Sequence, residues 1–169
     1  MAVRFEYTAP VIKMTKLERA IEVSHWGGNL AFEEKYWMTN EGAKLKGHFD
    51  RVAWAGTAYY NPATHAIKQL TYNLGVGAMD PYFTDEIGNV STSRFRSNLA
   101  EAHLELKPRF PVFGGWNYSF TVGWNHELGK FLRGDGENFV LKVPFLEGPK
   151  QPTAYDEVEL LVILPEGAT

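Results

Sequence analysis

The sequence predicts an all-β fold, mainly an antiparallel β-sandwich with at most one or two short helices. Apolar and polar residues alternate with a period of two along much of the chain, which is the pattern of half-buried strands. Turns rich in glycine and asparagine separate the alternating segments. A doubly wound fold would need long amphipathic helices, and the sequence contains none, so many short strands joined by turns favour a sandwich.

The elements follow from this alternation in chain order. Five segments are predicted to be strands with one buried face: Leu17–Val23, Leu30–Met38, Ala102–Leu106, Tyr118–Trp124 and Val158–Leu164. Shorter strands are predicted at Val3–Tyr7, Ala66–Leu74, Tyr82–Ile87, Val90–Arg96 and Phe139–Phe145. A short helix is expected around Phe49–Ala58, where Gly56 weakens it. Turns are expected at Gly27-Gly28-Asn29, Asn40-Glu41-Gly42, Gly88-Asn89, Gly134-Asp135-Gly136 and Gly148-Pro149.

The last predicted strand is unusual because Leu160-Leu161-Val162-Ile163-Leu164 is apolar on both faces. The favoured interpretation is a strand at the centre of the domain, covered on both sides. The alternative is a strand that packs against a neighbour outside this chain.

Composition places the chain among ordinary globular proteins. Of its 169 residues, 44% are hydrophobic and 22% charged, and we expect residues 1–169 to form a single β-rich domain. The net charge is −3 and basic residues form no runs, so no nucleic-acid partner is expected. The absence of cysteine excludes thiol catalysis and cysteine metal sites.

Catalytic and metal-binding patterns are also missing. None of the five histidines (His25, His48, His65, His103 and His126) has the spacing of a zinc site, and His25 is expected to make a structural hydrogen bond at a strand end. The carboxylate pairs Glu33–Glu34, Asp85–Glu86 and Glu157–Glu159 are expected to be solvated, whereas a general acid must be desolvated. No serine lies in a nucleophile elbow. We therefore expect no catalytic residue, metal or cofactor.

Two acceptor triplets for N-linked glycans occur, Asn89-Val90-Ser91 and Asn117-Tyr118-Ser119. About one is expected by chance at this composition, so placement matters more than number. Asn89 follows Gly88 in a predicted surface turn, where an enzyme could reach it. Asn117 begins a strand directly after Trp116 and is the weaker candidate.

A second notable segment runs from Pro108 to Trp116. It contains three large aromatic residues, Phe110, Phe113 and Trp116. The prolines between and before them restrict the backbone φ angle, whereas the glycines allow a wide range of φ. The favoured interpretation is that these aromatics plug the end of the sandwich, because buried aromatics are commoner than exposed clusters. The alternative is a surface that stacks on peptide or sugar, or that meets another subunit.

Four segments in this order resemble the lumenal part of the ribophorin I family, a subunit of the eukaryotic oligosaccharyltransferase. They are Ile21-Glu22-Val23-Ser24-His25-Trp26-Gly27, Asp85-Glu86-Ile87-Gly88-Asn89-Val90-Ser91-Thr92-Ser93, Pro108-Arg109-Phe110-Pro111-Val112-Phe113-Gly114-Gly115-Trp116 and Ile163-Leu164-Pro165-Glu166-Gly167-Ala168. The match is looser over Phe49–Asp80, Arg94–Glu101 and Leu128–Asn138. The family is β-rich, which agrees with the alternation, and its shared Gly-Asn-Val-Ser-Thr-Ser run implies a glycan at Asn89.

The resemblance also implies a function. In that family a separate multi-spanning catalytic subunit transfers an oligosaccharide from a dolichol-linked donor to asparagine. Ribophorin I helps assembly and the handling of certain acceptor polypeptides. The implied role is therefore a non-catalytic domain whose partners are the other subunits, including the catalytic one, and also nascent polypeptide.

Location is the one property on which the residues and the resemblance differ. No apolar run approaches the length of a membrane span and the N-terminus lacks a signal-peptide pattern, which alone would indicate the cytosol. The resemblance instead implies the endoplasmic reticulum lumen and a fragment of a longer subunit, anchored by a transmembrane segment outside this chain. A carbohydrate- or peptide-binding β-sandwich is the alternative function, and an independent hydrolase a third.

Overall fold

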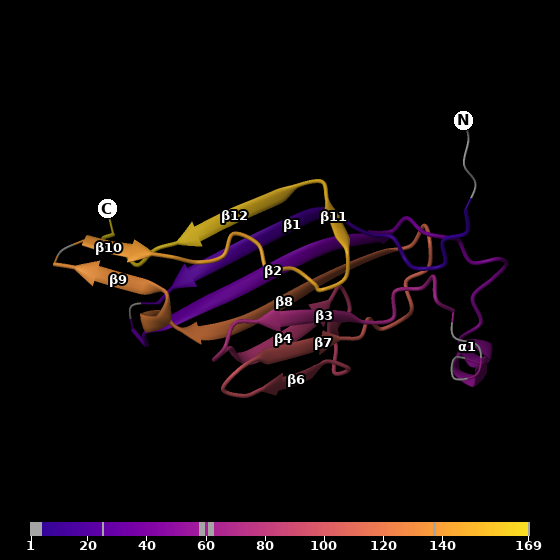
Figure 1. Cartoon of the computed structure of the whole chain (residues 1–169), viewed down its shortest axis with the longest axis horizontal. Helices are drawn as coiled ribbons and strands as arrows, with labels where there is room; N and C mark the ends of the chain where they lie inside the picture. Colours follow the sequence, from indigo (N-terminus) through magenta and orange to yellow (C-terminus); the bar gives the residue numbers. More distant parts are fainter. Residues whose placement is uncertain (1–4, 25, 58–59, 61–62, 137, 169) are drawn as a thin grey trace.

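The computed structural model describes residues 5–168 apart from 25, 58–59, 61–62 and 137. The described residues form twelve strands, one short α-helix and one 3₁₀ helix (Figure 1), so the predicted all-β fold is confirmed. The predicted strand Val3–Tyr7 begins outside the described residues, and Phe5 to Tyr7 form no strand. The prediction for His25 also lies outside them. No described helix is long and apolar enough to cross a bilayer.

A seven-stranded sheet forms the main layer. Its two longest strands, β1 and β2, are antiparallel neighbours, and β8 continues the sheet beyond β2. In spatial order the strands are β11 (Thr153–Tyr155), β1 (Ile12–Val23), β2 (Asn29–Asn40), β8 (Asn117–Glu127), β4 (Met79–Asp85) and β5 (Gly88–Asn89), with β12 (Val158–Ile163) also beside β1. The predicted long strands are therefore present, but β11 and β12 run parallel to β1.

The inner face of this sheet is the core. Alternation sends Leu17, Tyr36 and Phe120 to the same side of three neighbouring strands, where the register places them in one row. The Tyr36 and Phe120 rings stack with centroids 4.9 Å apart. Burying each such aromatic side chain stabilises the fold by roughly 1.5–3 kcal/mol. Side-chain alternation in the sequence therefore determines which face is buried.

A smaller sheet covers this inner face. It consists of β3 (Leu70–Leu74), β7 (Ala102–Leu106) and β6 (Arg94–Ser97). Tyr72 of β3 is fully buried and its ring meets Tyr36 edge-on at 6.1 Å. A separate hairpin comprises β9 (Leu132–Asp135) and β10 (Asn138–Leu141), preceded by the 3₁₀ helix η1 (Leu128–Lys130). The two facing sheets form the predicted layered β structure.

The helix α1 (Arg51–Thr57) lies within the predicted helical segment. Asp50 starts it, because its Oδ1 accepts hydrogen bonds from the backbone N–H groups of Val52 (2.8 Å) and Ala53 (3.0 Å). No residue of the helix is buried, yet the Trp54 ring lies edge-on against Phe113 at 5.5 Å. This contact holds the helix against the aromatic connector.

The favoured prediction for the C-terminal strand was wrong. β12 lies at the edge of the large sheet with β1 as its strand neighbour, and its apolar side chains stay partly exposed, from 37% for Leu160 to 59% for Leu161. A central strand and an uncovered edge strand present the same apolar pattern in sequence. Only the pairing separates them, so this interpretation could not be decided from the residues alone.

Candidate functional site: the Asn89 turn and the aromatic connector

The turn before Asn89 is built by Asp85. Its Oδ1 accepts hydrogen bonds from the backbone N–H groups of Ile87 (3.0 Å) and Gly88 (3.1 Å), which closes the turn at Glu86 and Ile87. Gly88 follows with φ of 135°, a conformation that favours glycine. The predicted turn at Gly88-Asn89 is therefore displaced by two residues, and Asn89 pairs with Thr84 in β5.

Arg109 of the connector clamps this turn. Its Nε donates to Asp85 Oδ2 at 2.7 Å and its Nη2 to Asp85 Oδ1 at 2.8 Å, a two-pronged ion pair. The same Nη2 also approaches the carbonyl oxygens of Gly88 (3.4 Å) and Asn89 (3.3 Å). Tyr118 completes the cluster by donating its hydroxyl to Asp85 Oδ2 at 3.1 Å. The acceptor turn and the connector are thus one structural unit.

The electrostatics of this cluster differ from the prediction for Asp85. Its side chain is only 3% exposed rather than solvated. The hydrogen bond from Arg109 lowers the pKa of Asp85 to about 2, with smaller contributions from the turn N–H groups and Tyr118. Burial raises the pKa of Tyr118. A carboxyl group with so low a pKa stays ionised and does not act as a general acid near neutral pH.

The two asparagines predicted as glycan acceptors are both exposed. Asn89 lies beside the turn, and the following Val90 is buried and anchors the segment by donating its N–H to the Phe83 carbonyl at 2.9 Å. Asn117 begins β8 and pairs with Thr39 of β2. Asn89 therefore lies on the short strand at one end of the sheet order, whereas Asn117 is the first residue of β8, which lies between β2 and β4.

The aromatic connector packs mainly as a structural plug. Phe113 is buried, and Phe110 and Trp116 are partly buried against the core. Trp116 meets Phe113 edge-on at 5.3 Å, and Phe110 meets Tyr118 at 5.4 Å. Gly114 allows the connector to cross directly over another loop, because a Cβ there would overlap the backbone carbonyl of Gly42.

Part of the connector still reaches the surface. Phe49, Phe110, Trp116 and Asn117 line an open, shallow groove of about 430 Å³. Three of its four lining residues are aromatic, and none of the four is ionisable. The arrangement can offer apolar and aromatic contacts to a flexible chain or a sugar, but it carries no group positioned for proton transfer.

A buried ion pair is the main feature that the sequence prediction missed. Arg19 and Glu34 have fully buried side chains and are in direct contact, and Glu147 pairs with Arg19 at 3.0 Å. Tyr36 donates its hydroxyl to Glu34 at 2.5 Å. The expectation that Glu34 is solvated was wrong, although its position between Phe32 and Tyr36 on the apolar face could have revealed this.

The surroundings of this ion pair indicate a structural role. The Arg19 guanidinium lies over the Phe32 ring at 5.1 Å, so aromatic rings as well as carboxylates surround it. Burial raises the pKa of Glu34, opposed by the charge of Arg19. The cluster joins β1 and β2 to Glu147 from the segment before β11. We assign it the role of tying that segment to the sheet.

The other groups considered for chemistry lie apart. His103 bonds to Glu101 at 2.8 Å near the surface, while His126 is buried and its pKa is lowered by burial. Among the described residues no group of three or more histidine or acidic side chains is arranged to hold a metal.

Comparison with known proteins shows the family to which this chain belongs. The family model described as ribophorin I matches residues 1–169, the whole sequence. The chain belongs to the ribophorin I family. The connector and the Asn89 turn, whose motifs carried the resemblance, are the segments that Arg109 and Asp85 join in this ribophorin I domain.

Relatives named dolichyl-diphosphooligosaccharide–protein glycosyltransferase subunit 1 match nearly all of it. The protein from Schizosaccharomyces pombe is 35% identical over 167 residues, covering 99% of this chain and 37% of its own length. That from Caenorhabditis elegans is 36% identical over 164 residues, covering 97% and 28%. The chain thus spans about a third of these relatives.

A solved structure shares the fold at low sequence identity. A two-domain M1 zinc metallopeptidase, an E323A mutant bound to L-arginine, aligns with a TM-score of 0.51 over 94% of this chain and 34% of its own. The sequences are 11% identical, so the likeness concerns the fold alone.

Proposed function

We propose that this chain is a non-catalytic lumenal domain of an oligosaccharyltransferase subunit 1. It supports protein N-glycosylation by helping the complex assemble and by handling acceptor polypeptides. Its partners are other subunits, including the catalytic one, and nascent polypeptide. It works on the lumenal side of the endoplasmic reticulum, within a longer membrane-anchored subunit.

The observation that carries this proposal is the family match along all 169 residues, together with relatives named subunit 1 at 34–36% identity. The structure supports a scaffolding role through the partners of its buried charges. Arg19 and Glu34 pair with each other, and Asp85 pairs with Arg109. These charged side chains pair with each other and stabilise the fold. In an enzyme, buried charged groups would instead point toward a substrate.

The test has two parts. The full-length subunit, tagged and expressed in cells that lack the endogenous protein, is expected to co-purify with glycosyltransferase activity and to restore glycosylation of reporter proteins. The 169-residue chain alone, given an acceptor peptide and a lipid-linked oligosaccharide donor, is expected to show no transfer. Turnover by the isolated chain, or purification without the other subunits, would contradict the proposal.

We further propose that Asn89 carries an N-linked glycan in the native setting. Its exposed side chain and its place directly after the turn support this, whereas Asn117 is the weaker acceptor because it begins a long strand, β8, directly after Trp116. Protein from secretory cells should lose one glycan in the Asn89→Gln variant and change mobility accordingly. Loss of the glycan in Asn117→Gln instead would reverse the assignment.

A second candidate function is direct binding of carbohydrate or peptide at the connector. The groove lined by Phe49, Phe110 and Trp116 favours it, because aromatic surfaces stack on both ligands. Titrating glycans and acceptor peptides while recording tryptophan fluorescence tests this function. A response that disappears in Trp116→Leu would support it, and no response at millimolar ligand would reject it.

A further inference from the structure

The large sheet has an outer face, which points away from the core, and Asn89 lies on it. Asn89 is paired with Thr84 of β4, and directly paired residues of neighbouring strands place their side chains on the same face. Thr84 follows Phe83, which is buried in the core, so alternation turns Thr84 outward. The side chain of Asn89 therefore points outward too.

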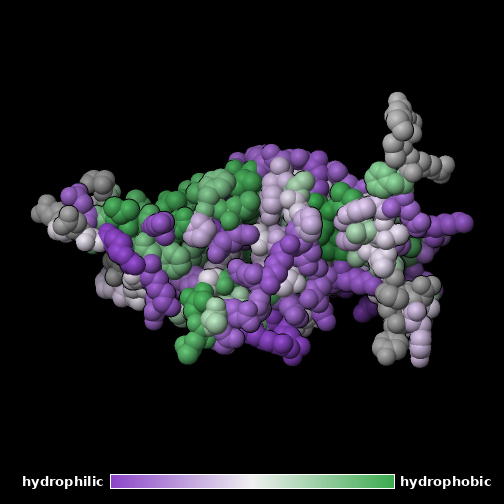
Figure 2. Space-filling view, in the orientation of Figure 1, coloured by the Kyte–Doolittle hydropathy of each residue, from purple (hydrophilic) through white to green (hydrophobic). Residues whose placement is uncertain are grey.

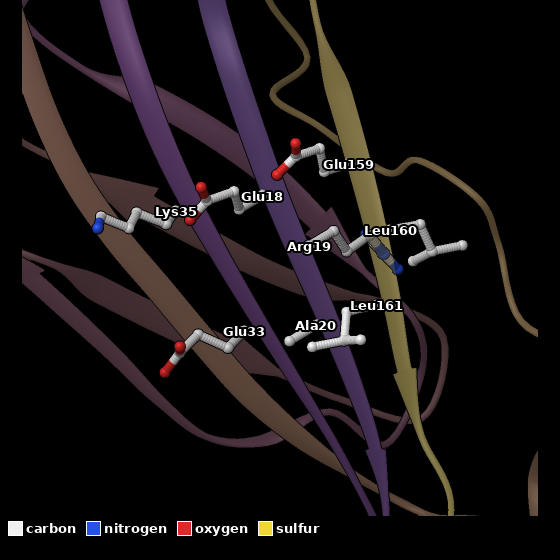
Figure 3. A pocket seen from close by; sticks show the side chains of 8 residues that line it. All are labelled: Glu18, Arg19, Ala20, Glu33, Lys35, Glu159, Leu160 and Leu161. Atoms are coloured by element: carbon white, nitrogen blue, oxygen red, sulfur yellow. The ribbon is translucent and has the colours of Figure 1, made fainter.

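A row of outward-facing residues continues from Asn89 across the whole sheet. The register joins its members strand by strand: Asn89, Thr84, Thr121, Lys35, Glu18 and Glu159. Figure 3 shows Glu33 and Lys35 of β2 extending to one side of the sheet and Arg19 of β1 to the other. The part of the row nearest Asn89 carries hydroxyl groups, whereas charged side chains begin at β2.

The apolar surface of the large sheet gathers at the opposite end of this row. Figure 2 shows hydrophobic surface over the position that β12 occupies in Figure 1, where Leu161 is 59% exposed. Close to Asn89 the outward residues of β4 and β8 include Thr84, Ser119 and Thr121. A surface of hydroxyl groups suits a hydrated ligand such as a saccharide better than an apolar segment of protein.

Tyr82 places an aromatic ring within this polar surface. It lies two residues before Thr84 on the same face of β4, and it is paired with Gly123 of β8. A Cβ at Gly123 would overlap the Tyr82 ring, so the ring lies across β8 in the space that a side chain would fill. The Tyr82 hydroxyl donates to Glu33 of β2, which holds the ring in place. Because Tyr82 is still 41% exposed, one side of the ring rests on the sheet and the other faces solvent.

Trp37 is the other aromatic residue that the described strands place on this face. Two cations lie over its ring, with Lys35 Nζ at 4.7 Å and Lys16 Nζ at 5.7 Å from the ring centroid. A sugar would have to displace both ammonium groups before it could stack on Trp37. Within the described part of the chain no cation lies over Tyr82 in this way, so the Tyr82 ring is the open one.

The Tyr82 ring is within reach of a glycan attached to Asn89. Neighbouring strands lie about 4.8 Å apart, so β8 is about 10 Å from β5 across β4. Along β4, Tyr82 is displaced from Thr84 by two residues, which is about 7 Å. The first sugars of a glycan cover such a distance. Covalent attachment also holds them near the ring at an effective concentration on the order of millimolar, so a weak contact becomes populated.

We propose that the Tyr82 ring binds the inner sugars of the N-linked glycan at Asn89, so that the glycan lies along the outer face of β4 and β8. The apolar C–H face of an N-acetylhexosamine ring packs on Tyr82, and the hydroxyl groups of Thr84 and Thr121 bond to the sugar hydroxyls. This inference rests on the proposed glycan at Asn89. It concerns a surface separate from the groove at the aromatic connector.

A glycan at Asn89 also limits what else can cover this part of the sheet. A sugar on an outward-facing asparagine occupies the space above its neighbours Thr84 and Tyr82. A protein segment cannot fill that space at the same time, whether it comes from the rest of the same subunit or from another chain. The two kinds of occupant can be told apart, because Asn89→Gln removes the glycan alone.

The first experiment uses the chain from secretory cells, after mass spectrometry has located the glycan. Sugar protons should shift upfield in the ring current of Tyr82 and show nuclear Overhauser effects to its ring protons, and Asn89→Gln should remove these signals. Tyr82→Phe keeps the ring and should retain the shifts, whereas Tyr82→Leu should abolish them. The matched control Trp37→Leu removes the other aromatic residue of this face and should leave them unchanged.

A second measurement compares the urea unfolding of each protein with and without the glycan. Contact with the ring should shift the folding equilibrium of the glycosylated protein toward the folded state by about two- to tenfold. Tyr82→Phe should keep this gain and Tyr82→Leu should lose it. If Tyr82→Leu fails to fold because Gly123 loses its cover, the nuclear Overhauser effects in the unaltered protein decide the question.

The outcomes separate this inference from the proposed function. If Asn89 is glycosylated but its sugars show no contact with Tyr82, or if Tyr82→Leu leaves the stability gain unchanged, the inference is overturned while the glycan and the complex stand. An unmodified Asn89 would overturn the acceptor assignment and this inference together. In the full-length subunit, an endoglycosidase should release the glycan faster from Tyr82→Leu than from the unaltered protein, and equal rates would overturn the inference there.

Discussion

Replacing Asp85 by asparagine removes one negative charge from the cluster that joins the Asn89 turn to the connector. Asparagine keeps an oxygen that can accept from the Ile87 and Gly88 N–H groups, so the turn itself is preserved. What is lost is the charge-assisted pair with Arg109, whose two bonds are 2.7 and 2.8 Å long. The variant therefore measures the value of the clamp.

The magnitude follows from the pKa of Asp85, which falls from its usual 3.8 to about 2. At about 1.36 kcal/mol per unit this is roughly 2.4 kcal/mol of folding free energy at pH 7. Arg109 is 36% exposed, so solvent screening reduces the expected loss to about 1–2 kcal/mol. Because the folded pKa is depressed, this stability is complete above about pH 4 and disappears as the pH falls toward 2.

The assay is urea unfolding followed by tryptophan fluorescence at pH 7 and pH 3. Asp85→Asn should lower the free energy of unfolding at pH 7, and its difference from the unaltered protein should shrink by roughly half at pH 3. Glu86→Gln changes an exposed carboxylate in the same turn and should have little effect. If Asp85→Asn does not lower the free energy of unfolding at pH 7, or lowers it equally at pH 7 and pH 3, the ion pair between Asp85 and Arg109 does not stabilise the fold as reasoned here.

Two other substitutions test the packing. Gly114→Ala should cost at least about 3 kcal/mol or prevent folding, because its Cβ would overlap the Gly42 carbonyl, whereas Gly129→Ala meets open space and should be nearly neutral in the same urea experiment. Arg19→Met should cost about 3–5 kcal/mol at pH 7 by leaving Glu34 buried without its cation, and its stability should rise at lower pH as Glu34 becomes neutral. The double variant Arg19→Met/Glu34→Leu should recover most of the loss in thermal unfolding, and a loss equal to that of the single variant would contradict this account.

Local pattern was sufficient for the long strands. In β1, β2, β7 and β8 the apolar residues at every second position become the buried face, because side-chain alternation is a property of the strand itself. The same pattern places Glu34 on the inward face, between Phe32 and Tyr36. The pattern of one strand does not indicate which cation pairs with this carboxylate. Arg19 is supplied by another strand through the β1–β2 register.

The candidate site was predicted in part. The Asn89 turn and the aromatic connector were recognised from their own residues, but the contact between them depends on Arg109 reaching Asp85 across 24 positions. The observed turn also lies two residues before the predicted one, because Asp85 Oδ1 accepts hydrogen bonds from the N–H groups of Ile87 and Gly88. Side-chain hydrogen bonds of this kind compete with the backbone preferences that a turn prediction uses.

The amino-acid sequence by itself determined the family, the all-β class and which side chains are apolar, because these depend on residue identity and on spacing along one segment. Tertiary structure alone decided that β12 lies beside β1 at the edge of the large sheet in the part of the chain that the structure describes, that Arg19 neutralises Glu34, and that the connector holds the acceptor turn. Each of these depends on two segments far apart in the chain, and the chain must close the loop between them before either residue acquires its neighbour.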